Sequence, residues 1–215
     1  MCMDNTVGSL NPFQRSVVMG SLLGDGYLRR VSGRRNAFLE INHSIAQRAY
    51  VDWLYDVLRP FSAGAPRSRG GNGARVAYRF TTKQHDDFTQ LMKMFYHNKK
   101  KIIPFNLRLD PIMLAVWYMD DGSMCRLSDV YLNTQQFSDH EQRLLVHKLY
   151  ELGICASVNK DKTYQRIRLK KASVPILLKL LAPYVIPSMH YKLHRDPVET
   201  TRRSPHSVVQ RRVMI

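Results

Sequence analysis

The chain has 215 residues, a length that suits one large domain or two small ones. Lys and Arg number 33 against 17 Asp and Glu, which gives a formal net charge of +16. So large an excess indicates a polyanionic partner, because each phosphate that Lys or Arg neutralises releases counterions. No stretch of about 18 apolar residues could cross a membrane, and the three cysteines are far apart, without a metal-binding spacing. We therefore expect a soluble protein of a reducing compartment, with no membrane partner and no structural zinc.

Two helices are predicted from the same start signal. An Asx-Pro pair at residues 11–12 and another at 110–111 supply a capping side chain followed by a proline, which suits the first helical position. The apolar segments that follow both run into an Asp-Gly pair, at 25–26 and at 121–122. We expect each glycine to end its helix with a positive φ, where a β-carbon is unfavourable.

Periodicity predicts the remaining elements. Strands are expected where apolar and polar residues alternate, at 39–42, 75–81 and 130–135 and in a pair that ends at 166–170. Helices are expected from apolar residues at helical spacing, at 50–58, 88–95 and 176–184. Ser138 and Glu141 form a capping box for one more helix. The segment 64–73 is rich in Gly, Arg and Ser and is expected to be a loop.

The order of these elements repeats along the chain. Lys101 follows Asp25, and Lys192 follows Asp121, at nearly the same spacing. The two Asp-Gly pairs, which mark the start of the repeat period, are too far apart in sequence for a solenoid, so a pseudo-twofold pair of lobes is favoured. We therefore expect an N-terminal αββαββα repeat, a second such repeat and a basic tail that either touches nucleic acid or is disordered, with the boundaries 1–108, 109–193 and 194–215.

The two Asp-Gly pairs indicate a shared site. One such pair is weak support, because Asp and Gly are ordinary turn residues. If the two apolar helices pack side by side, with Gly20 and Ala115 allowing a close approach, then Asp25 and Asp121 meet at the base of the interface. Carboxylates so close repel each other unless a cation lies between them. Oxygen ligands without a nearby His or Cys cluster favour Mg²⁺ over zinc, and this arrangement suits phosphodiester hydrolysis.

The segments that carry these acids resemble a known family. VMGSLLGDG at 18–26 and AVWYMDDGS at 115–123 resemble the two motifs of the LAGLIDADG homing endonucleases, in the single-chain form that carries both. NKKKIIP, YLNTQQFS and YVIPSMHYKL extend the resemblance, which runs from about residue 12 to residue 193. It implies an α+β fold of two pseudo-twofold αββαββα repeats. The motif helices would form the interface, and the antiparallel sheets would form a saddle over DNA.

The resemblance also implies a metal site. Asp25 and Asp121 match the metal-binding acids of the family, and the backbone carbonyls of Gly24 and Asp120 match the groups that complete the metal shell. Asp120 departs from the first motif, which has glycine there, and we give its side chain a secondary place. The implied cofactor is Mg²⁺. We expect Mn²⁺ to substitute for it, and Ca²⁺ to support binding without cleavage.

The implied activity is site-specific cleavage of both strands of DNA. Lys101 and Lys192 match the basic residues that organise the hydrolytic water. The resemblance further implies a monomer with internal pseudo-twofold symmetry, a long asymmetric target, short 3′ overhangs and a role in intron mobility. Two alternatives stay open: an RNA maturase that binds intron RNA, and a catalytically silent transcriptional regulator. For the compartment, a mitochondrion or chloroplast that encodes the protein is favoured over a bacterial cytoplasm.

Polar strand faces supply candidate DNA contacts. In the major groove Arg reads guanine and Asn or Gln reads adenine, while Lys binds phosphate. Each such residue alone is more typical of a solvated surface, but as a set on a protein of charge +16 they indicate DNA contact. The candidates are Arg29, Arg30, Arg34, Arg35, Arg75, Arg79, Asn133, Gln135, Arg166, Arg168 and Lys170.

Overall fold

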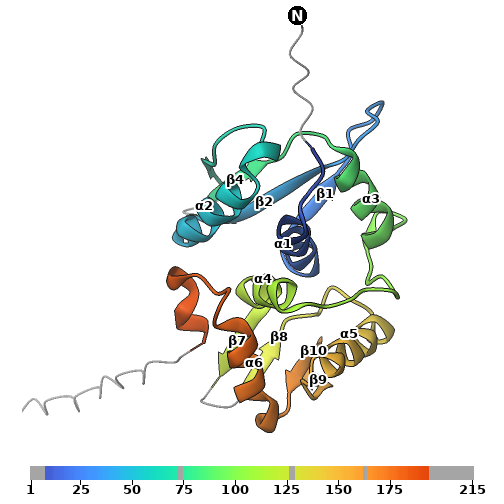
Figure 1. The fold of residues 1–215 in the computed structure, drawn as a ribbon, viewed down its shortest axis with the longest axis vertical. Helices are drawn as coiled ribbons and strands as arrows, with labels where there is room; N and C mark the ends of the chain where they lie inside the picture. The colour runs from blue at the N-terminus through green and yellow to red at the C-terminus, as the bar shows by residue number, and fades with distance from the viewer. Residues whose placement is uncertain (1–7, 72–74, 126–128, 162–163, 194–215) are drawn as a thin grey trace, which may run out of the picture.

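The computed structural model describes residues 8–71, 75–125, 129–161 and 164–193. The expected tail at 194–215 lies outside these residues. In the described chain the main elements follow the order αββαββα, and this order occurs twice in succession (Figure 1). The expected α+β class and the two-repeat architecture are therefore confirmed, whereas the boundary between residues 108 and 109 stays a prediction.

The bounds of the elements are as follows. The first repeat contains α1 (Pro12–Leu23), β1 (Tyr27–Arg29), β2 (Phe38–Ser44), α2 (Arg48–Val57), β3 (Arg67–Gly70), β4 (Val76–Thr81) and α3 (Asp86–Phe95). The second contains α4 (Pro111–Asp121), β7 (Gly122–Cys125), β8 (Asp129–Leu132), α5 (Asp139–Glu151), β9 (Ala156–Asp161), β10 (Tyr164–Leu169) and α6 (Val174–Leu181). The short strands β5 (Tyr96–His97) and β6 (Lys100–Lys101) and the 3₁₀ helices η1 (Ile45–Gln47), η2 (Arg59–Phe61), η3 (Lys171–Ser173) and η4 (Pro187–Lys192) complete the described elements.

Each repeat forms one four-stranded antiparallel sheet, in the order β1-β2-β4-β3 and β7-β8-β10-β9. The expectation of a loop over 64–73 is wrong in part, because residues 67–70 form the edge strand β3. All four of its residues are exposed, so it lacks the alternation that reveals a half-buried strand. Backbone pairing with β4 holds this strand in place, and Arg67 lies opposite Arg79 in that pairing.

The two motif helices lie side by side between the sheets (Figure 1). Residues 17–23 of α1 and 113–119 of α4 are buried without a break, as expected for helices covered on all sides. A β-carbon added at Gly20 would lie 2.6 Å from the carbonyl oxygen of Met113 and 2.7 Å from the Cβ of Val116. The expected close approach at Gly20 is therefore confirmed.

The helix starts are also confirmed. The Asn11 side chain accepts the N–H of Gln14 at 2.9 Å, and the Gln14 side chain accepts the Asn11 N–H, which forms a capping box. Asp110 accepts the N–H of Met113 at 2.8 Å at the start of α4. Ser138 caps α5 with a second capping box. These short-range signals fix where the helices begin.

The reason proposed for the glycines that follow the acids is wrong. Neither Gly26 nor Gly122 has a positive φ. A β-carbon at Gly26 would lie 2.8 Å from the Cβ of Ser21, and one at Gly122 would lie 2.2 Å from the ring of Tyr118. Glycine is required because the chain turns back tightly against the helix it has just left.

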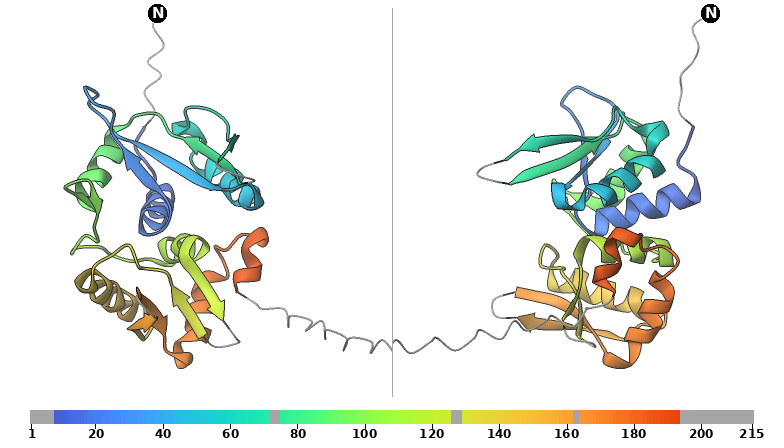
Figure 2. Two further views of the ribbon diagram at one scale, coloured as in Figure 1. Left: turned by 180° about the vertical axis from the view of Figure 1, so that it is seen from behind. Right: turned by 90° about the vertical axis from the view of Figure 1, so that its left-hand side faces the viewer.

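The sheets project from the motif helices to one side of the molecule. The right-hand view of Figure 2 shows the β3–β4 and β9–β10 strand pairs extending in the same direction from the two lobes. Helix α2 packs against β2 and β4, and α5 packs against β9 and β10, so each sheet has one covered face and one open face. Among the described residues no helix is long and apolar enough to span a bilayer.

Candidate active site

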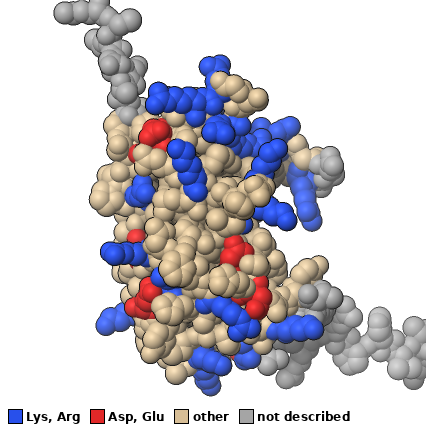
Figure 3. Space-filling view, turned by 90° about the vertical axis from the view of Figure 1, so that its right-hand side faces the viewer, with Lys and Arg blue, Asp and Glu red and all other residues tan. Residues whose placement is uncertain are grey.

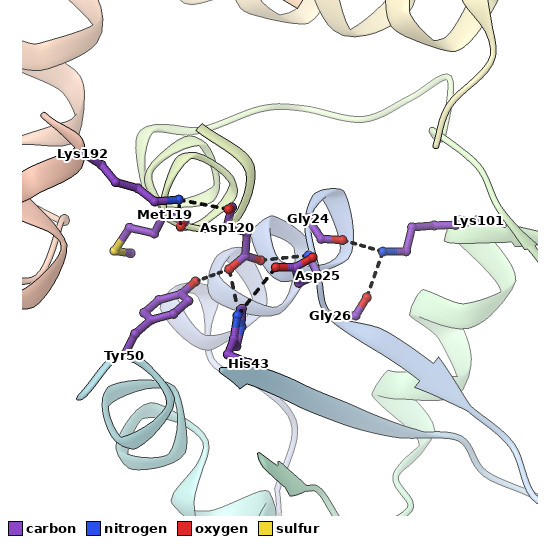
Figure 4. Close-up of polar contacts among 9 residues, drawn as sticks. All are labelled: Gly24, Asp25, Gly26, His43, Tyr50, Lys101, Met119, Asp120 and Lys192. Atoms are coloured by element: carbon purple, nitrogen blue, oxygen red, sulfur yellow. Dashed lines mark hydrogen bonds and ion pairs between the residues drawn. The ribbon is translucent and has the colours of Figure 1, made fainter. Parts of the chain in front are cut away.

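The ends of α1 and α4 meet at a cluster of polar groups (Figure 4). Helix α1 ends at Leu23, and the chain then turns through Gly24 and Asp25. Helix α4 continues one residue past Asp120. The N–H of Asp25 donates to Asp120 Oδ2 at 3.1 Å, so residues far apart in sequence come into direct contact. The two motifs therefore meet at the base of the helix interface, but the contact is made by Asp120, and the expected meeting of Asp25 with Asp121 stays a prediction.

The side chain of Asp120 is the centre of this cluster. It is almost completely buried, and its Oδ1 accepts the hydroxyl of Tyr50 at 2.8 Å. Burial, together with the charge of Asp25, raises the pKa of Asp120 to about 7. Burial, with the charge of Asp120, likewise raises the pKa of Tyr50, which keeps this hydroxyl protonated as a donor. The side chain of Asp120 is therefore more central to the site than the secondary role that we expected from the sequence.

His43 is a member of the site that sequence reasoning missed. Its ring lies 3.6 Å from Asp25 and 3.7 Å from Asp120, and one ligand atom from each of the three residues falls within 4.8 Å of the others. Burial lowers the pKa of His43, so a neutral ring with a free lone pair is favoured. The sequence interpretation named no histidine among the ligands, whereas the structure places this one beside the acids. His43 lies on the inward face of β2, where the alternating pattern predicted only core.

The two lysines lie where the repeat predicts them. Lys101 Nζ donates to the carbonyl oxygens of Gly24 at 2.7 Å and Gly26 at 2.9 Å. Lys192 Nζ, on η4, donates to the carbonyl oxygens of Met119 and, at 3.0 Å, Asp120. Both repeats thus aim one ammonium group at the carbonyl that precedes the motif acid, as Figure 4 shows.

Two opposing effects act on the pKa of each lysine ammonium group. Burial lowers the pKa of Lys101 and of Lys192, while the charges of the three nearby aspartates oppose that fall. The carbonyl oxygens of Gly24 and Asp120 accept hydrogen bonds from these lysines. Their assignment to a metal shell stays a prediction.

Asp121 is the second motif acid. Its Oδ2 atom is buried and has no hydrogen-bond partner among the described residues. Burial, followed by the charges of Asp25 and Asp120, raises the pKa of Asp121 to about 8. A carboxylate oxygen buried beside other carboxylates without a donor is what a cation would stabilise.

The donor set fits a divalent cation. Carboxylates of Asp25 and Asp121 and the backbone carbonyls beside them are hard oxygen ligands, which suit Mg²⁺, Mn²⁺ and Ca²⁺. His43 adds one nitrogen, which is compatible with Mn²⁺ but less typical of Mg²⁺. The orphaned Oδ2 of Asp121 is the observation that supports a cation here.

The open face of the first sheet carries two of the predicted DNA contacts, Arg29 and Arg79. Glu40 lies 3.3 Å from Arg29 and 3.8 Å from Arg79, which ties the two guanidinium groups together across β1, β2 and β4. Arg67 and Arg69 on β3 share this face and line the same groove, but were missed because the segment was taken as a loop. The sheet register brings all five side chains to one surface.

The open face of the second sheet holds a separate group. The guanidinium of Arg166 lies 3.9 Å from the ring centroid of Tyr131, and Arg168 donates to Asp129 at 2.6 Å. Asn133 is half-buried, and its N–H donates to the carbonyl of Asp121 at 3.0 Å. This bond connects the end of β8 to the acid site.

The other candidates are exposed, in turns and at strand ends: Arg30, Arg34, Arg35, Arg75, Gln135 and Lys170. Lys170 lines the same pocket as Arg168 and Asp129, and Arg30 lines one with Arg29. Figure 3 shows that Lys and Arg outnumber Asp and Glu on the face it presents and are densest over its upper, N-terminal half. The structure thus divides the predicted contacts between two sheets and does not gather them at one point.

The family follows from a comparison with known proteins. Residues 15–177 match the LAGLIDADG DNA endonuclease family. This match spans most of the chain, so the chain belongs to that family. The resemblance of the two motifs is thereby confirmed.

Relatives of this chain include two fungal proteins. It is 30% identical over 211 residues to the cytochrome b mRNA maturase bI2 of Saccharomyces cerevisiae, which covers 89% of this chain and 49% of the maturase. It is 28% identical over 202 residues to a probable intron-encoded endonuclease of Wickerhamomyces canadensis, covering 86% of this chain and 85% of the relative. The chain therefore spans about half of the yeast maturase but most of the endonuclease relative.

Solved structures share the fold. The homing endonuclease I-WcaI, bound to its DNA recognition sequence, superposes with a TM-score of 0.80 at 26% identity, over 87% of this chain and 88% of that one. I-DmoI matches with TM-scores of 0.53, in a complex with nicked target DNA and Mn, and 0.51, with DNA and Ca. The two I-DmoI chains are 13% and 14% identical to this one, so they show the fold alone.

Proposed function

We propose that this chain is a site-specific DNA endonuclease that cuts both strands of a long target in the presence of a divalent cation. The observation that carries the proposal is that the ends of the two motif helices meet, with the Asp25 N–H donating to the Asp120 side chain, and that each repeat aims one lysine at the carbonyl preceding its motif acid. A catalytically silent regulator would have no use for a buried acid such as Asp121, whose oxygen lacks a donor among the described residues.

The residues divide the chemistry between two equivalent centres. A divalent cation supplies charge neutralisation at the scissile phosphate and a water of lowered pKa. Asp25 and Asp121, with the carbonyls of Gly24 and Asp120, would hold it. Mg²⁺ is the cation we propose; Mn²⁺ would substitute for it, and Ca²⁺ would support DNA binding alone.

The lysines and the open sheet faces complete the mechanism. Lys101 and Lys192 are half-buried and lie beside the motif carbonyls, where their ammonium groups offset the charge that builds up on a cut phosphate. The two sheet faces, with their Arg groups, bind the duplex on either side of the acids and read its sequence. One chain then suffices, because its two repeats supply what two subunits would, and we propose a monomer that leaves short 3′ overhangs.

A selection experiment tests this function. A pool of DNA duplexes with a randomised segment is incubated with the protein in Mg²⁺, and linearised molecules are sequenced at their ends. We expect one long asymmetric site to be enriched, with short 3′ overhangs, and no product in EDTA. Random ends, or no product in Mg²⁺ or Mn²⁺ from protein that is folded, would exclude a site-specific endonuclease.

A second candidate function is supported by one comparison. The similarity to the yeast cytochrome b mRNA maturase covers 89% of this chain, so assistance in splicing of a host intron is the alternative, with intron RNA as the partner. Both fungal relatives bear names that refer to introns or intron splicing, and we propose that this chain too is encoded in an organelle intron. Comparing affinity for the host intron RNA with affinity for the selected DNA site distinguishes the two functions.

A further inference from the structure

The peptide that joins Gly24 to Asp25 has an unusual support. Helix α1 ends at Leu23, and Gly24 has the non-helical dihedrals φ −104° and ψ −128°, so this peptide lies outside the helix. Its N–H belongs to Asp25 and donates to the side chain of Asp120, at 3.1 Å. Its C=O belongs to Gly24 and accepts from Lys101, at 2.7 Å.

The two ends of this peptide are mechanically coupled. A trans peptide is planar, and its N–H and C=O point in opposite directions. Whatever fixes the N–H of Asp25 therefore also fixes the direction of the Gly24 carbonyl. Because the Asp25 carboxylate is carried by the next Cα, it inherits the same constraint. One bond to Asp120 thus orients the Gly24 carbonyl and fixes the Cα from which the Asp25 carboxylate extends.

The Asp120 side chain is built to make this bond. A β-carbon on Gly24 would lie 2.5 Å from Asp120 Oδ2, so only glycine leaves room for the carboxylate beside the peptide. The Tyr50 hydroxyl donates to the other oxygen, Oδ1, at 2.8 Å, and the ring of His43 lies 3.7 Å from the same atom. The carboxylate is held at both oxygens and is shielded from water.

The second centre needs no such support. The peptide that joins Asp120 to Asp121 lies within the last turn of α4, and the N–H of the next residue, Gly122, donates to the carbonyl of Tyr118. The helix itself therefore fixes the carbonyl of Asp120 and the carboxylate of Asp121. The departure between the motifs, Gly24 in one and Asp120 in the other, gives the two centres different means of support.

We propose that the Asp120 side chain is a positioning residue, reaching from the second repeat into the first to hold the Gly24–Asp25 peptide in the geometry that its centre requires. This inference rests on the proposed endonuclease function for its kinetic consequence only. Loss of the Asp120 side chain disables the centre of Asp25 and spares the centre of Asp121. The result is a nicking enzyme.

The design of the test depends on two substitutions at one position. Asp120→Ala removes the acceptor of the Asp25 N–H. Asp120→Asn keeps one oxygen to accept that N–H, while its amide can donate to the Tyr50 hydroxyl, which then acts as an acceptor. The asparagine variant therefore preserves a positioning role, whereas it would weaken a direct role as a charged metal ligand.

Two measurements on the full chain test the role. Hydrogen exchange at single amides reports the bond directly and needs no DNA. We expect Asp120→Ala to lose protection at the Asp25 amide by about tenfold or more, Asp120→Asn to keep it, and the Gly26 amide, which donates to Ser21 O at 2.7 Å, to stay protected in both. On the DNA site found by selection, Asp120→Ala should slow cleavage of one strand by about tenfold to a hundredfold and accumulate nicked product.

A matched variant controls for the loss of a buried hydrogen bond. Thr82→Val removes the side chain that accepts the Leu39 N–H at 2.9 Å, in the same lobe but away from the acids, and should leave both strands cut at the ordinary ratio. The role is excluded if Asp120→Ala keeps the Asp25 amide protected, or if it slows both strands equally. A loss of Ca²⁺ binding in Asp120→Asn as complete as in Asp25→Asn would instead make Asp120 a metal ligand. Because the exchange result needs no cleavage, failure of the endonuclease function would not obscure it.

Discussion

A β-carbon on Gly24 would lie 2.4 Å from the Cβ of Asp120, so the side chain of the second motif fills the space that glycine leaves in the first. We expect Gly24→Ala to lower the free energy of unfolding by about 1 to 3 kcal/mol, because the added methyl overpacks a buried contact. Asp120→Gly costs stability as well, through the lost hydrogen bonds. The double variant should lose less than the sum of the two, because the clash is then relieved. Urea denaturation of all four proteins measures this coupling, and additive losses would contradict the contact.

The contact between the motif helices makes a second prediction. A β-carbon at Gly20 would lie 2.6 Å from a backbone oxygen of Met113, which cannot rotate away. Gly20→Ala should therefore force α1 and α4 apart and cost about 1 to 3 kcal/mol or more. Gly64→Ala is the matched control, because nothing lies within 4 Å of its added β-carbon. If thermal unfolding shows equal midpoints for the two variants, the helices do not pack as described.

The acid cluster predicts a pH dependence of stability without metal. Burial raises the pKa of Asp120 to about 7 and that of Asp121 to about 8, from an unfolded value of 3.8. The folded state then binds more protons than the unfolded state, so this contribution to stability is complete below pH 3.8 and is lost as pH rises through 7 to 8. In EDTA, the titration of these two acids should lower the free energy of unfolding by roughly 4 kcal/mol between pH 6 and pH 8.5.

Metal should reverse that loss. A cation binds the ionised carboxylates of the folded state, so Ca²⁺ or Mg²⁺ should raise the unfolding midpoint more at pH 8.5 than at pH 6. The variant Asp121→Asn should show a smaller pH dependence and a smaller metal effect. An equal shift by Ca²⁺ at both pH values would place the cation elsewhere on the protein.

The sheet faces predict two kinds of DNA contact. Arg166 is held against the ring of Tyr131 on a strand, so we expect Arg166→Ala to relax the choice of base at one position of the target, at a cost of about 1 to 3 kcal/mol. Arg34 is exposed in the turn between β1 and β2, where a phosphate contact is expected. Arg34→Ala should weaken binding to all sequences and reduce the salt dependence by about one counterion. Titrations in Ca²⁺ at several salt concentrations, with matched and mismatched targets, separate the two effects.

The parts of the fold that sequence predicted are those set by neighbours along the chain. Asn11, Asp110 and Ser138 cap helices through residues three positions away, and their bonds are present as expected. The strand at 67–70 was missed because both faces of its side chains are exposed, so no hydrophobic pattern marks it. Of the two glycines after the acids, Gly122 ends its helix as predicted, whereas α1 ends earlier, at Leu23 with Gly24 as its C-cap. The clash that requires both glycines involves side chains about one turn earlier, which a dihedral argument does not see.

The site was predictable in its acids and lysines because the repeat supplies each of them twice. His43 and Tyr50 are not marked in the sequence by an equivalent residue in the second repeat. Each lies on the inward face of its element, where a buried His or Tyr is indistinguishable from ordinary core until the facing residue is known. That facing residue is Asp120, 70 positions from Tyr50, and only the packing of the two repeats brings it there.

The most direct test of the central claim is strand-resolved cleavage of the selected target by Asp25→Asn and Asp121→Asn. The account predicts that each variant loses double-strand cleavage by about a hundredfold or more, while its affinity for the target in Ca²⁺ and its unfolding midpoint at pH 6 without metal stay close to those of the parent protein. Undiminished double-strand cleavage by either variant, or a loss of folding and DNA binding in step with the loss of cleavage, would contradict it.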